Sequence, residues 1–354
     1  MLNSVRAKLL SLKFRAIRRT VIALFAKWPK DLERAIVIGD SLNHLLMNSP
    51  FRYFFKFKIP KNIKTELYNL SFPSPLIAAS FKDDVSSLYQ WQLMGLGGMT
   101  YKTVLKAPSD GNKRPRIQEI NYNGGYGLIN SLGLPTKGVE YFIDNLENEK
   151  LLSFDRPVGI SVGGDSAAEY LEVFKLVHSK VDSLSFDKFF YEVNISCPNT
   201  DDGKCLSDNL HGLSTLLNEI RALCSNIIIV KVSPDSKKED IFEICNLLSS
   251  IGRCAINLGN TKYITAESVG LNKKNFSKEG GGLSGAGLFE NTLKNVELVS
   301  SHFDIPIIAT GGISTYDNVR AVLDKGATLA GMASQLVIDP FQIPLINNRL
   351  SNEK

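Results

Sequence analysis

The chain has 354 residues, of which 44% are hydrophobic and 22% charged, a composition typical of a soluble globular protein with a large core. It excludes a disordered chain or a collagen-like repeat. The longest stretches without a charged residue, 85–101 and 120–136, are interrupted by polar residues, so no membrane-spanning helix is expected. Five cysteines without a CxxC pair and four scattered histidines exclude a zinc cluster or haem attachment, and we expect no metal site.

Positive charge is concentrated at the start of the chain. Residues 1–62 hold 13 Lys and Arg against 3 Asp and Glu, whereas the rest of the chain holds 28 against 33. We therefore expect two parts, a basic helical extension over residues 1–62 and a mildly acidic catalytic body over residues 63–354.

The extension is predicted to begin with an amphipathic helix over residues 10–28. Its apolar stripe consists of Leu10, Phe14, Ile17, Val21, Leu24, Phe25 and Trp28. Arg15, Arg18 and Arg19 are expected on the opposite side, and the segment contains no acidic residue. Such a helix is typical of an anionic membrane interface, with packing on the body and a removable targeting peptide as alternatives.

A second helix is predicted over residues 31–47, and an aromatic run follows at residues 51–57. Together with the first helix, these segments would form an apolar entrance for a quinone.

From about residue 63, short apolar runs alternate with helical patterns, as in repeated βα units around a parallel sheet. Helices are expected at 167–180 and 238–249. The predicted strands are residues 75–79, 98–102, 157–162, 190–195, 227–232, 255–258, 305–310 and 328–332. Eight such units indicate an α/β fold, a closed (β/α)8 TIM barrel with an N-terminal helical extension. An open doubly wound sheet is the alternative, but no Gly-x-Gly-x-x-Gly follows the first strand.

Polar side chains cluster where the predicted strands end, which is where a barrel places its active site. Lys102, Asn194 and Lys231 fall at the ends of the second, fourth and fifth strands, and an Asn-rich segment follows the sixth. One lysine in such a place is commonly a solvated charge, but two beside Asn-rich strand ends favour a site. The long connection 103–155 is predicted to serve that site.

Glycine-rich segments accompany the last two strands. They are 280–285, Gly311 with Gly312, and the segment that begins at Gly331. Backbone amides in such loops commonly hold a phosphate, although tight turns explain each segment equally well on its own. We therefore expect a ligand that carries a phosphate.

Cys197 directly follows the fourth strand, in the segment Asn194-Ile-Ser-Cys-Pro-Asn. Cys224, Cys245 and Cys254 lie within predicted helices or strands and fit the role of packing residues. Cys197 lies just past a strand end between two carboxamides and is therefore predicted to transfer a proton or to act as a nucleophile. No His or Asp lies directly beside it in the sequence to suggest a protease-like pair.

Five motifs together resemble those of the dihydroorotate dehydrogenase family, FMN-containing (β/α)8 enzymes of pyrimidine (UMP) synthesis. They are segments 130–135, 194–199, 230–234, 281–285 and 309–313, and the resemblance runs from about residue 70 to residue 340. Cys197 occupies the position of the catalytic base, which is Cys in the soluble class 1 enzymes and Ser in the membrane-bound class 2 enzymes. The barrel thus resembles class 1, although class 1 enzymes lack the extension.

The resemblance implies that Cys197 removes a proton from (S)-dihydroorotate while a hydride passes to FMN, with orotate as product. Lys102 would contact both flavin and substrate. The substrate would be held by Lys102, Asn130, Ser131, Leu132, Gly133, Leu134, Asn194, Asn199, Asn260 and Thr261. The flavin would be held by Ala79, Ser80, Lys102, Thr103, Ser161, Asn194, Lys231, Gly259, Gly285, Gly311, Gly312, Ala333 and Ser334.

Phe81, Ala333 and the loop 201–205 depart from the family pattern, which affects the expected loop geometry. The electron acceptor implied is quinone or fumarate. NAD, reached through a partner subunit, would be compatible with the same flavin and substrate site. The resemblance is compatible with a homodimer. We expect a cytoplasmic enzyme, either free or attached to the inner face of the membrane through residues 10–28.

Two other kinds of enzyme share these features. A flavin-dependent tRNA-dihydrouridine synthase also combines an FMN barrel with an active-site Cys, but RNA binding favours a basic working face and this body is net acidic. No nucleic-acid partner is therefore expected. A dihydropyrimidine dehydrogenase-like oxidoreductase is the other alternative. A non-catalytic membrane-surface scaffold is disfavoured, because Lys102, Cys197 and the asparagines are retained.

Overall fold

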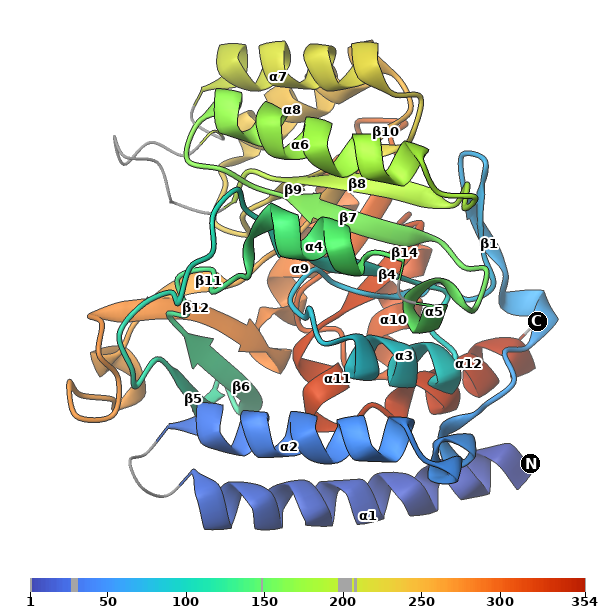
Figure 1. Cartoon of the computed structure of the whole chain (residues 1–354), viewed down its shortest axis with the longest axis vertical. Coiled ribbons are helices and arrows are strands. Elements are labelled where there is room, and N and C mark those ends of the chain that lie inside the picture. Colours follow the sequence, from blue (N-terminus) through green and yellow to red (C-terminus); the bar gives the residue numbers. More distant parts are fainter. Residues whose placement is uncertain (1, 27–30, 148, 197–205, 207–208, 354) are drawn as a thin grey trace.

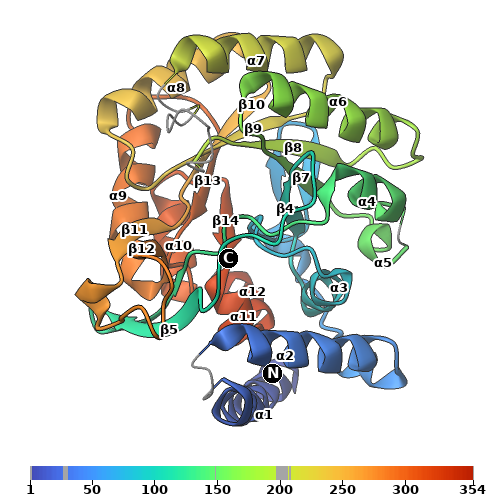
Figure 2. The ribbon, with the colours of Figure 1, turned by 60° about the vertical axis from the view of Figure 1, so that its left-hand side comes forward.

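Eight parallel strands close into a barrel that is surrounded by helices (Figures 1 and 2). The computed structural model describes residues 2–26, 31–147, 149–196, 206 and 209–353. The barrel strands are β3 (Leu76–Ala78), β4 (Gly98–Val104), β7 (Val158–Val162), β8 (Phe189–Asn194), β9 (Ile228–Val232), β10 (Cys254–Leu258), β13 (Ile307–Thr310) and β14 (Leu329–Met332). The predicted (β/α)8 barrel and its eight strands are confirmed, with strand ends that shift by at most two residues.

The outer helices follow the barrel strands, most of them connecting one strand to the next and α11 and α12 following the last strand, and they bury apolar side chains against the barrel. They are α3 (Val85–Met94), α4 (Gly138–Asn145), α5 (Glu149–Leu152), α6 (Ala167–Asp182), α7 (Leu210–Leu223), α8 (Lys238–Ile251), α9 (Phe289–Ser300), α10 (Tyr316–Asp324), α11 (Ser334–Ile338) and α12 (Gln342–Asn352). In α6, for example, Val173, Phe174 and Val177 are fully buried. The helices predicted at 167–180 and 238–249 are α6 and α8.

The barrel interior is apolar at one end and polar at the other. Phe190, Ile229 and Ile308 belong to a buried cluster that is completed by the hairpin of β1 (Thr65–Leu67) and β2 (Leu70–Phe72). Side chains two residues apart share one face of a strand. The next inward positions toward the carboxyl ends of these three strands are therefore Glu192, Lys231 and Thr310, so a polar layer lies above an apolar plug.

A four-stranded antiparallel sheet lies beside the barrel, in the order β11-β12-β6-β5. β5 (Ile117–Tyr122) and β6 (Gly125–Asn130) belong to the long connection after β4, and β11 (Lys262–Thr265) and β12 (Gly280–Gly285) to the connection after β10. The expectation that 280–285 is a loop was wrong. A side chain on Gly281 would place its Cβ 2.4 Å from the carbonyl oxygen of Asn130, so glycine lets β12 approach β6 closely.

The extension consists of two long helices, α1 (Leu2–Phe25) and α2 (Leu32–Met47), which lie side by side along one flank of the barrel (Figures 1 and 2). α1 contacts α12, whereas α2 contacts α3 and β5. The two predicted helices are confirmed over their described residues, and Trp28 lies outside these. A 3-10 helix, η1 (Pro50–Phe55), and then η2 (Lys61–Ile63) lead into the barrel.

α1 packs on the barrel, which was the alternative to a membrane interface, and it does so partly through the predicted stripe, since Leu10 and Phe14 pack against the core. Ala7 and Ser11 are buried, and the Phe14 ring lies 6.1 Å from that of Phe341. Arg18, predicted on the side opposite the stripe, donates a 2.6 Å bond to Glu119 of β5. Ile17, Leu24 and Phe25 of the predicted stripe are exposed. The helix thus presents apolar side chains both to the barrel and to solvent. Within the described residues, no helix is both long and apolar enough to span a membrane.

Candidate active site

Buried charges meet at the carboxyl-terminal mouth of the barrel. Lys231 of β9 donates through Nζ to Ser80 Oγ at 3.2 Å, and Ser80 Oγ donates to Glu192 Oε1 at 2.5 Å. Asn257 of β10 donates through Nδ2 to the other Glu192 oxygen at 2.9 Å. All four side chains are buried. The ammonium of Lys231 and the carboxylate of Glu192 therefore compensate each other through one hydroxyl, as buried charges require.

A second network joins the neighbouring strand ends. Asn194 donates through Nδ2 to Thr103 Oγ1 at 2.9 Å, and Thr103 shares a 3.0 Å hydrogen bond with Ser161. Ser196 Oγ donates to Asn194 Oδ1 at 2.7 Å and accepts a 2.5 Å bond from Asn260 Nδ2. The structure thus brings together four residues predicted from separate parts of the sequence: Thr103, Ser161, Asn194 and Asn260.

Lys102 ties strand β4 to the connection after β6. Its Nζ donates to the carbonyl oxygen of Pro135 at 2.5 Å and lies 3.8 Å from Asp83 Oδ2. Burial lowers the pKa of Lys102, and the nearby Asp83 carboxylate opposes that shift only in part. A ligand carboxylate beside this ammonium would favour its charged form.

The predicted substrate loop, residues 130–134, is held by both its side chains and its backbone. Asn130 Nδ2 donates to the carbonyl oxygen of Gly282 at 3.2 Å, and Gly133 and Leu134 have positive φ angles. The side chain of Leu132 packs into a cluster with Leu32 of the extension. These contacts fix the course of the loop between β6 and Lys102.

Predicted flavin-binding residues follow the barrel strands at this same end. The structure places them after β3 (Ala79, Ser80), β10 (Gly259), β13 (Gly311, Gly312) and β14 (Ala333, Ser334), whereas Gly285 is the last residue of β12 in the neighbouring sheet. Gly259 has φ +150°, and a Cβ there would lie 1.6 Å from the carbonyl oxygen of Thr310. The connections after β10 and β13 therefore approach each other more closely than any side chain at Gly259 would allow. Thr261 lies just before β11, where it faces Gly282.

Orphaned polar atoms in the mouth provide a test of the expected flavin. Asn257 Oδ1 and Thr310 Oγ1 are buried without a hydrogen-bond partner in the described part of the chain, and so is Ser131 Oγ in the substrate loop. Buried polar atoms are normally satisfied, so these three indicate that a polar ligand supplies their partners. An amide, hydroxyls, an ammonium and the amides of Gly311 and Gly312 match the mixed donors and acceptors of FMN and its phosphate.

Two predicted residues, Cys197 and Asn199, lie outside the described residues, as does the loop 201–205. Their roles stay predictions. Conversely, the prediction omitted Glu192, Asn257, Thr310 and Ser196 as site residues. Glu192 carried a signal, because it is the one charged residue of β8 and stands two positions before Asn194, on the same face of the strand.

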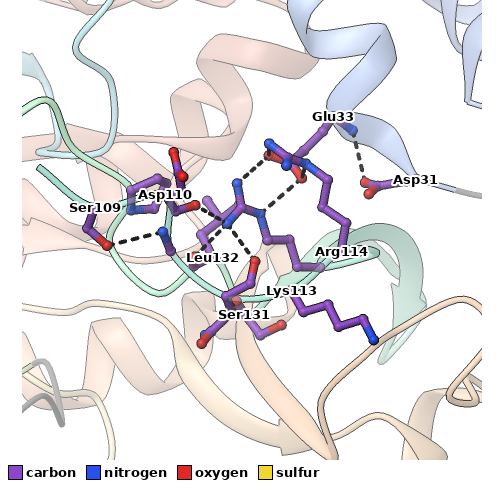
Figure 3. A network of polar contacts seen from close by, with 12 residues as sticks. Asp31, Glu33, Ser109, Asp110, Lys113, Arg114, Ser131 and Leu132 are labelled. Carbon is purple, nitrogen blue, oxygen red and sulfur yellow. Dashed lines mark hydrogen bonds and ion pairs between the residues drawn. The ribbon is translucent and has the colours of Figure 1, made fainter.

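Arg116 connects the extension with the predicted substrate loop. Figure 3 shows the polar network around Glu33, Asp110 and Leu132 to which it belongs. Its Nη2 and Nε donate to the two carboxylate oxygens of Glu33 in α2 at 2.8 and 3.0 Å. Its Nη1 donates to the carbonyl oxygens of Asp110, Asn112 and Leu132. Burial tends to raise the pKa of Glu33, but Arg116 and Arg114 outweigh it and the pKa is lowered. The ion pair thus couples the first turn of α2 to residues 131–132.

Comparisons with known proteins agree with this geometry. Residues 62–353 match the family model described as dihydroorotate dehydrogenase. The chain is 30% identical over 293 residues to the "Dihydroorotate dehydrogenase B (NAD(+)), catalytic subunit" of Bacillus mycoides, covering 81% of this chain and 90% of the relative. The catalytic subunit of the same name from Petrotoga mobilis is 31% identical over 281 residues, which cover 78% of this chain and 89% of that protein. The fold is similar to that of DHODH from Eimeria tenella in complex with ferulenol, with a TM-score of 0.70, 19% identity and 89% of each chain covered.

Proposed function

Because this chain belongs to the dihydroorotate dehydrogenase family, we propose that it oxidises (S)-dihydroorotate to orotate with FMN as cofactor, a step in UMP synthesis. The observation that carries the proposal is the polar layer in the barrel mouth. There, the compensated charges of Lys231 and Glu192 lie beside the orphaned atoms of Asn257 and Thr310. A ligand with both donors and acceptors would satisfy this layer.

FMN, when bound, supplies a ring that accepts a hydride. Lys231, Ser80 and Asn257 would hold that ring, and the amides of Gly311 and Gly312 its phosphate. The ammonium of Lys231 brings a fixed positive charge into a water-poor barrel mouth. Such a charge favours a ligand that gains electron density during the reaction.

The substrate would be bound by carboxamides and one cation. Asn130, Asn194 and Asn260 each offer a donor and an acceptor, which is what the imide-type edges of a dihydropyrimidine ring need. Lys102 would pair with the substrate carboxylate, and Ser131 Oγ has no other partner in the described part of the chain. Residues 130–134, held by Arg116 at Leu132 and followed by Pro135, which Lys102 binds, would close over the ring.

Cys197 is the proposed general base. Its thiolate would take the proton from C5, and the C5–H electron pair would form the C5=C6 double bond as a hydride leaves C6. An ordinary thiol has a pKa of about 8.5 and is therefore only partly ionised at neutral pH. Flavin reduction should accelerate as the pH rises through the ionisation of this thiol.

Anaerobic stopped-flow spectroscopy tests the proposal. Dihydroorotate should bleach the flavin absorbance of the FMN-loaded protein, whereas dihydrouracil, which lacks the carboxylate, should not. Replacing Cys197 by Ala should slow bleaching by about 10²- to 10⁴-fold while orotate still binds. A protein that cannot be loaded with FMN, or that dihydrouracil reduces as fast as dihydroorotate, would overturn the assignment.

We also infer that the electrons pass to a quinone at a membrane surface. The supporting feature is the outer face of the extension, which we define as the exposed apolar residues Val5, Leu9, Leu12, Ile17, Leu24, Val37, Leu42, Leu45, Phe51 and Phe54. Lys8, Lys13, Arg15 and Arg19 are exposed beside them on α1, which has no acidic residue. Apolar groups mixed with cations favour binding to anionic lipid.

The acceptor is identified by steady-state turnover of dihydroorotate with each candidate. A short-chain quinone should support turnover, and fumarate and NAD⁺ should not. The relatives named as NAD(+)-linked catalytic subunits define the alternative. Turnover that requires NAD⁺ and a second protein would replace quinone with a partner subunit.

A further inference from the structure

A cavity of about 780 Å³ lies between the extension and the barrel, away from the polar mouth. Its walls come from α1, from the segment that follows η1, and from the residues that precede β3, β7 and β8. Because these residues stand at the amino-terminal ends of the strands, the cavity opens at the opposite end of the barrel from the proposed active site.

The charges in this cavity are strongly unbalanced. Its ionisable lining residues are Arg6, Lys56, Lys58, Arg156, Lys188 and Asp155. Asp155 is engaged with Lys188, its Oδ2 lying 2.5 Å from the lysine Nζ. None of the other four cations has an acidic partner in the part of the chain that the structure describes. The cavity therefore holds a surplus of four positive charges.

The two arginines are fixed in place and partly desolvated. Arg6 donates to the carbonyl oxygen of Lys56 at 2.5 Å and lies 4.1 Å from the centre of the Phe57 ring. Its Nε is buried without a partner in the described residues. Arg156 donates to two backbone carbonyl oxygens and lies over the Phe154 ring, and burial lowers its pKa to about 10. A bound anion would therefore stabilise the positive charge of each guanidinium.

We propose that this cavity binds an organic phosphate. A phosphate offers several acceptor oxygens around a full negative charge, which suits converging guanidinium and ammonium groups better than a single carboxylate does. The cavity is much larger than a bare phosphate, and Phe57 and Phe154 lie in its wall. The ligand therefore carries an apolar or aromatic part beside its phosphate.

A soluble nucleotide and a phospholipid headgroup both have this chemistry. Either would contact α1 and the segment after η1 on one side and the barrel on the other. Binding would thus stabilise the attachment of the extension to the barrel.

The test compares two charge-reversed variants of the full chain with FMN added. K56E/K58E changes two exposed lysines of the cavity, whereas K175E/K294E makes the same change in net charge on the exposed surfaces of α6 and α9. ATP and pyrophosphate are titrated by calorimetry at low and at physiological salt. K56E/K58E should weaken binding by about tenfold or more, and K175E/K294E by less than about twofold.

A sedimentation assay with phosphatidylglycerol vesicles, and with phosphatidylcholine vesicles as control, distinguishes the lipid source. Release of K56E/K58E, but not of K175E/K294E, from phosphatidylglycerol identifies a headgroup as the ligand. Saturable binding of ATP that K56E/K58E alone loses identifies a soluble one. Equal behaviour of the two variants in both assays, or no binding of any probe, overturns the proposal.

Discussion

Glu192 is a buried carboxylate, 1% exposed, that reaches Lys231 only through the hydroxyl of Ser80. Glu192→Gln removes the negative charge that compensates the buried ammonium. We expect the free energy of unfolding to fall by about 1–3 kcal/mol, as for a buried polar group that loses its partner. Urea denaturation of the FMN-free protein measures this change.

The coupling of the two charges is tested by a double-mutant cycle. Lys231→Met alone leaves the Glu192 carboxylate uncompensated, whereas Glu192→Gln with Lys231→Met removes both charges. The double variant should be more stable than the sum of the single effects predicts, by about 0.5–3 kcal/mol. Effects that add within about 0.5 kcal/mol would show that the two residues do not compensate each other.

Site residues were predictable from the sequence where they stand at the end of a recognisable strand. Lys231 and Asn194 stand at the carboxyl ends of clearly apolar strands, and a barrel brings all such ends together. Glu192 was missed because an acidic residue in a strand is compatible with either face. Its place two residues before Asn194 suggested the inner face, and its hydrogen bonds with Ser80 and Asn257 show that it points into the barrel.

Arg116 and Arg114 both bind Glu33, but they differ greatly in exposure. The side chain of Arg116 is 3% exposed and that of Arg114 is 64% exposed. Arg116→Met should lower the free energy of unfolding by about 3 kcal/mol and raise the KM for dihydroorotate, because Leu132 loses its anchor. Arg114→Met, the matched control, should cost less than about 1 kcal/mol. Similar losses in the two variants would show that burial of Arg116 is not decisive.

The same ion pair predicts a pH dependence. Because the pKa of Glu33 is lower in the folded chain than its ordinary value of 4.5, its stabilising effect is present above that value. It is lost as the pH falls through the lowered pKa. Urea midpoints measured from about pH 6 down to about pH 3 should therefore decline more steeply in the parent protein than in Glu33→Gln. Glu66→Gln, which changes an exposed ion pair, should keep the steep decline.

Strands and helices were predictable from the sequence where a single hydrophobic pattern dominates the segment. The barrel strands are runs of buried apolar residues, so their existence and order followed directly from the sequence. β12 was missed because a glycine-rich segment has the composition of a loop, and only its close approach to β6 explains its glycines. Packing of α1 on the barrel was predicted only as an alternative to a membrane interface, because apolar residues occur on more than one side of the helix. Contacts of Phe14 with Phe341 and of Arg18 with Glu119 show that the helix packs on the rest of the chain.

The two opposite ends of the barrel thus differ in the polar groups that line them. The mouth combines opposite charges with orphaned amide and hydroxyl atoms, whereas the cavity at the other end has a surplus of cations. The extension touches both, through Glu33 near the predicted substrate loop and through Arg6 in the cavity. It therefore belongs to the folded body of the enzyme, although it lies outside the residues matched by the family model.

The outer face of the extension makes a prediction for the whole molecule. Leu12 and Leu24 are 58% and 68% exposed, so replacing both by Glu should leave the free energy of unfolding nearly unchanged. The two new carboxylates would oppose insertion into anionic lipid and repel its headgroups. L12E/L24E should therefore lose sedimentation with phosphatidylglycerol vesicles while dihydroorotate still bleaches the flavin at the parent rate. The matched control L176E/L223E makes the same change at exposed positions on α6 and α7 and should remain bound. If both variants sediment equally, the outer face is not a membrane-binding surface, and the inferred transfer of electrons to a membrane quinone loses its structural support.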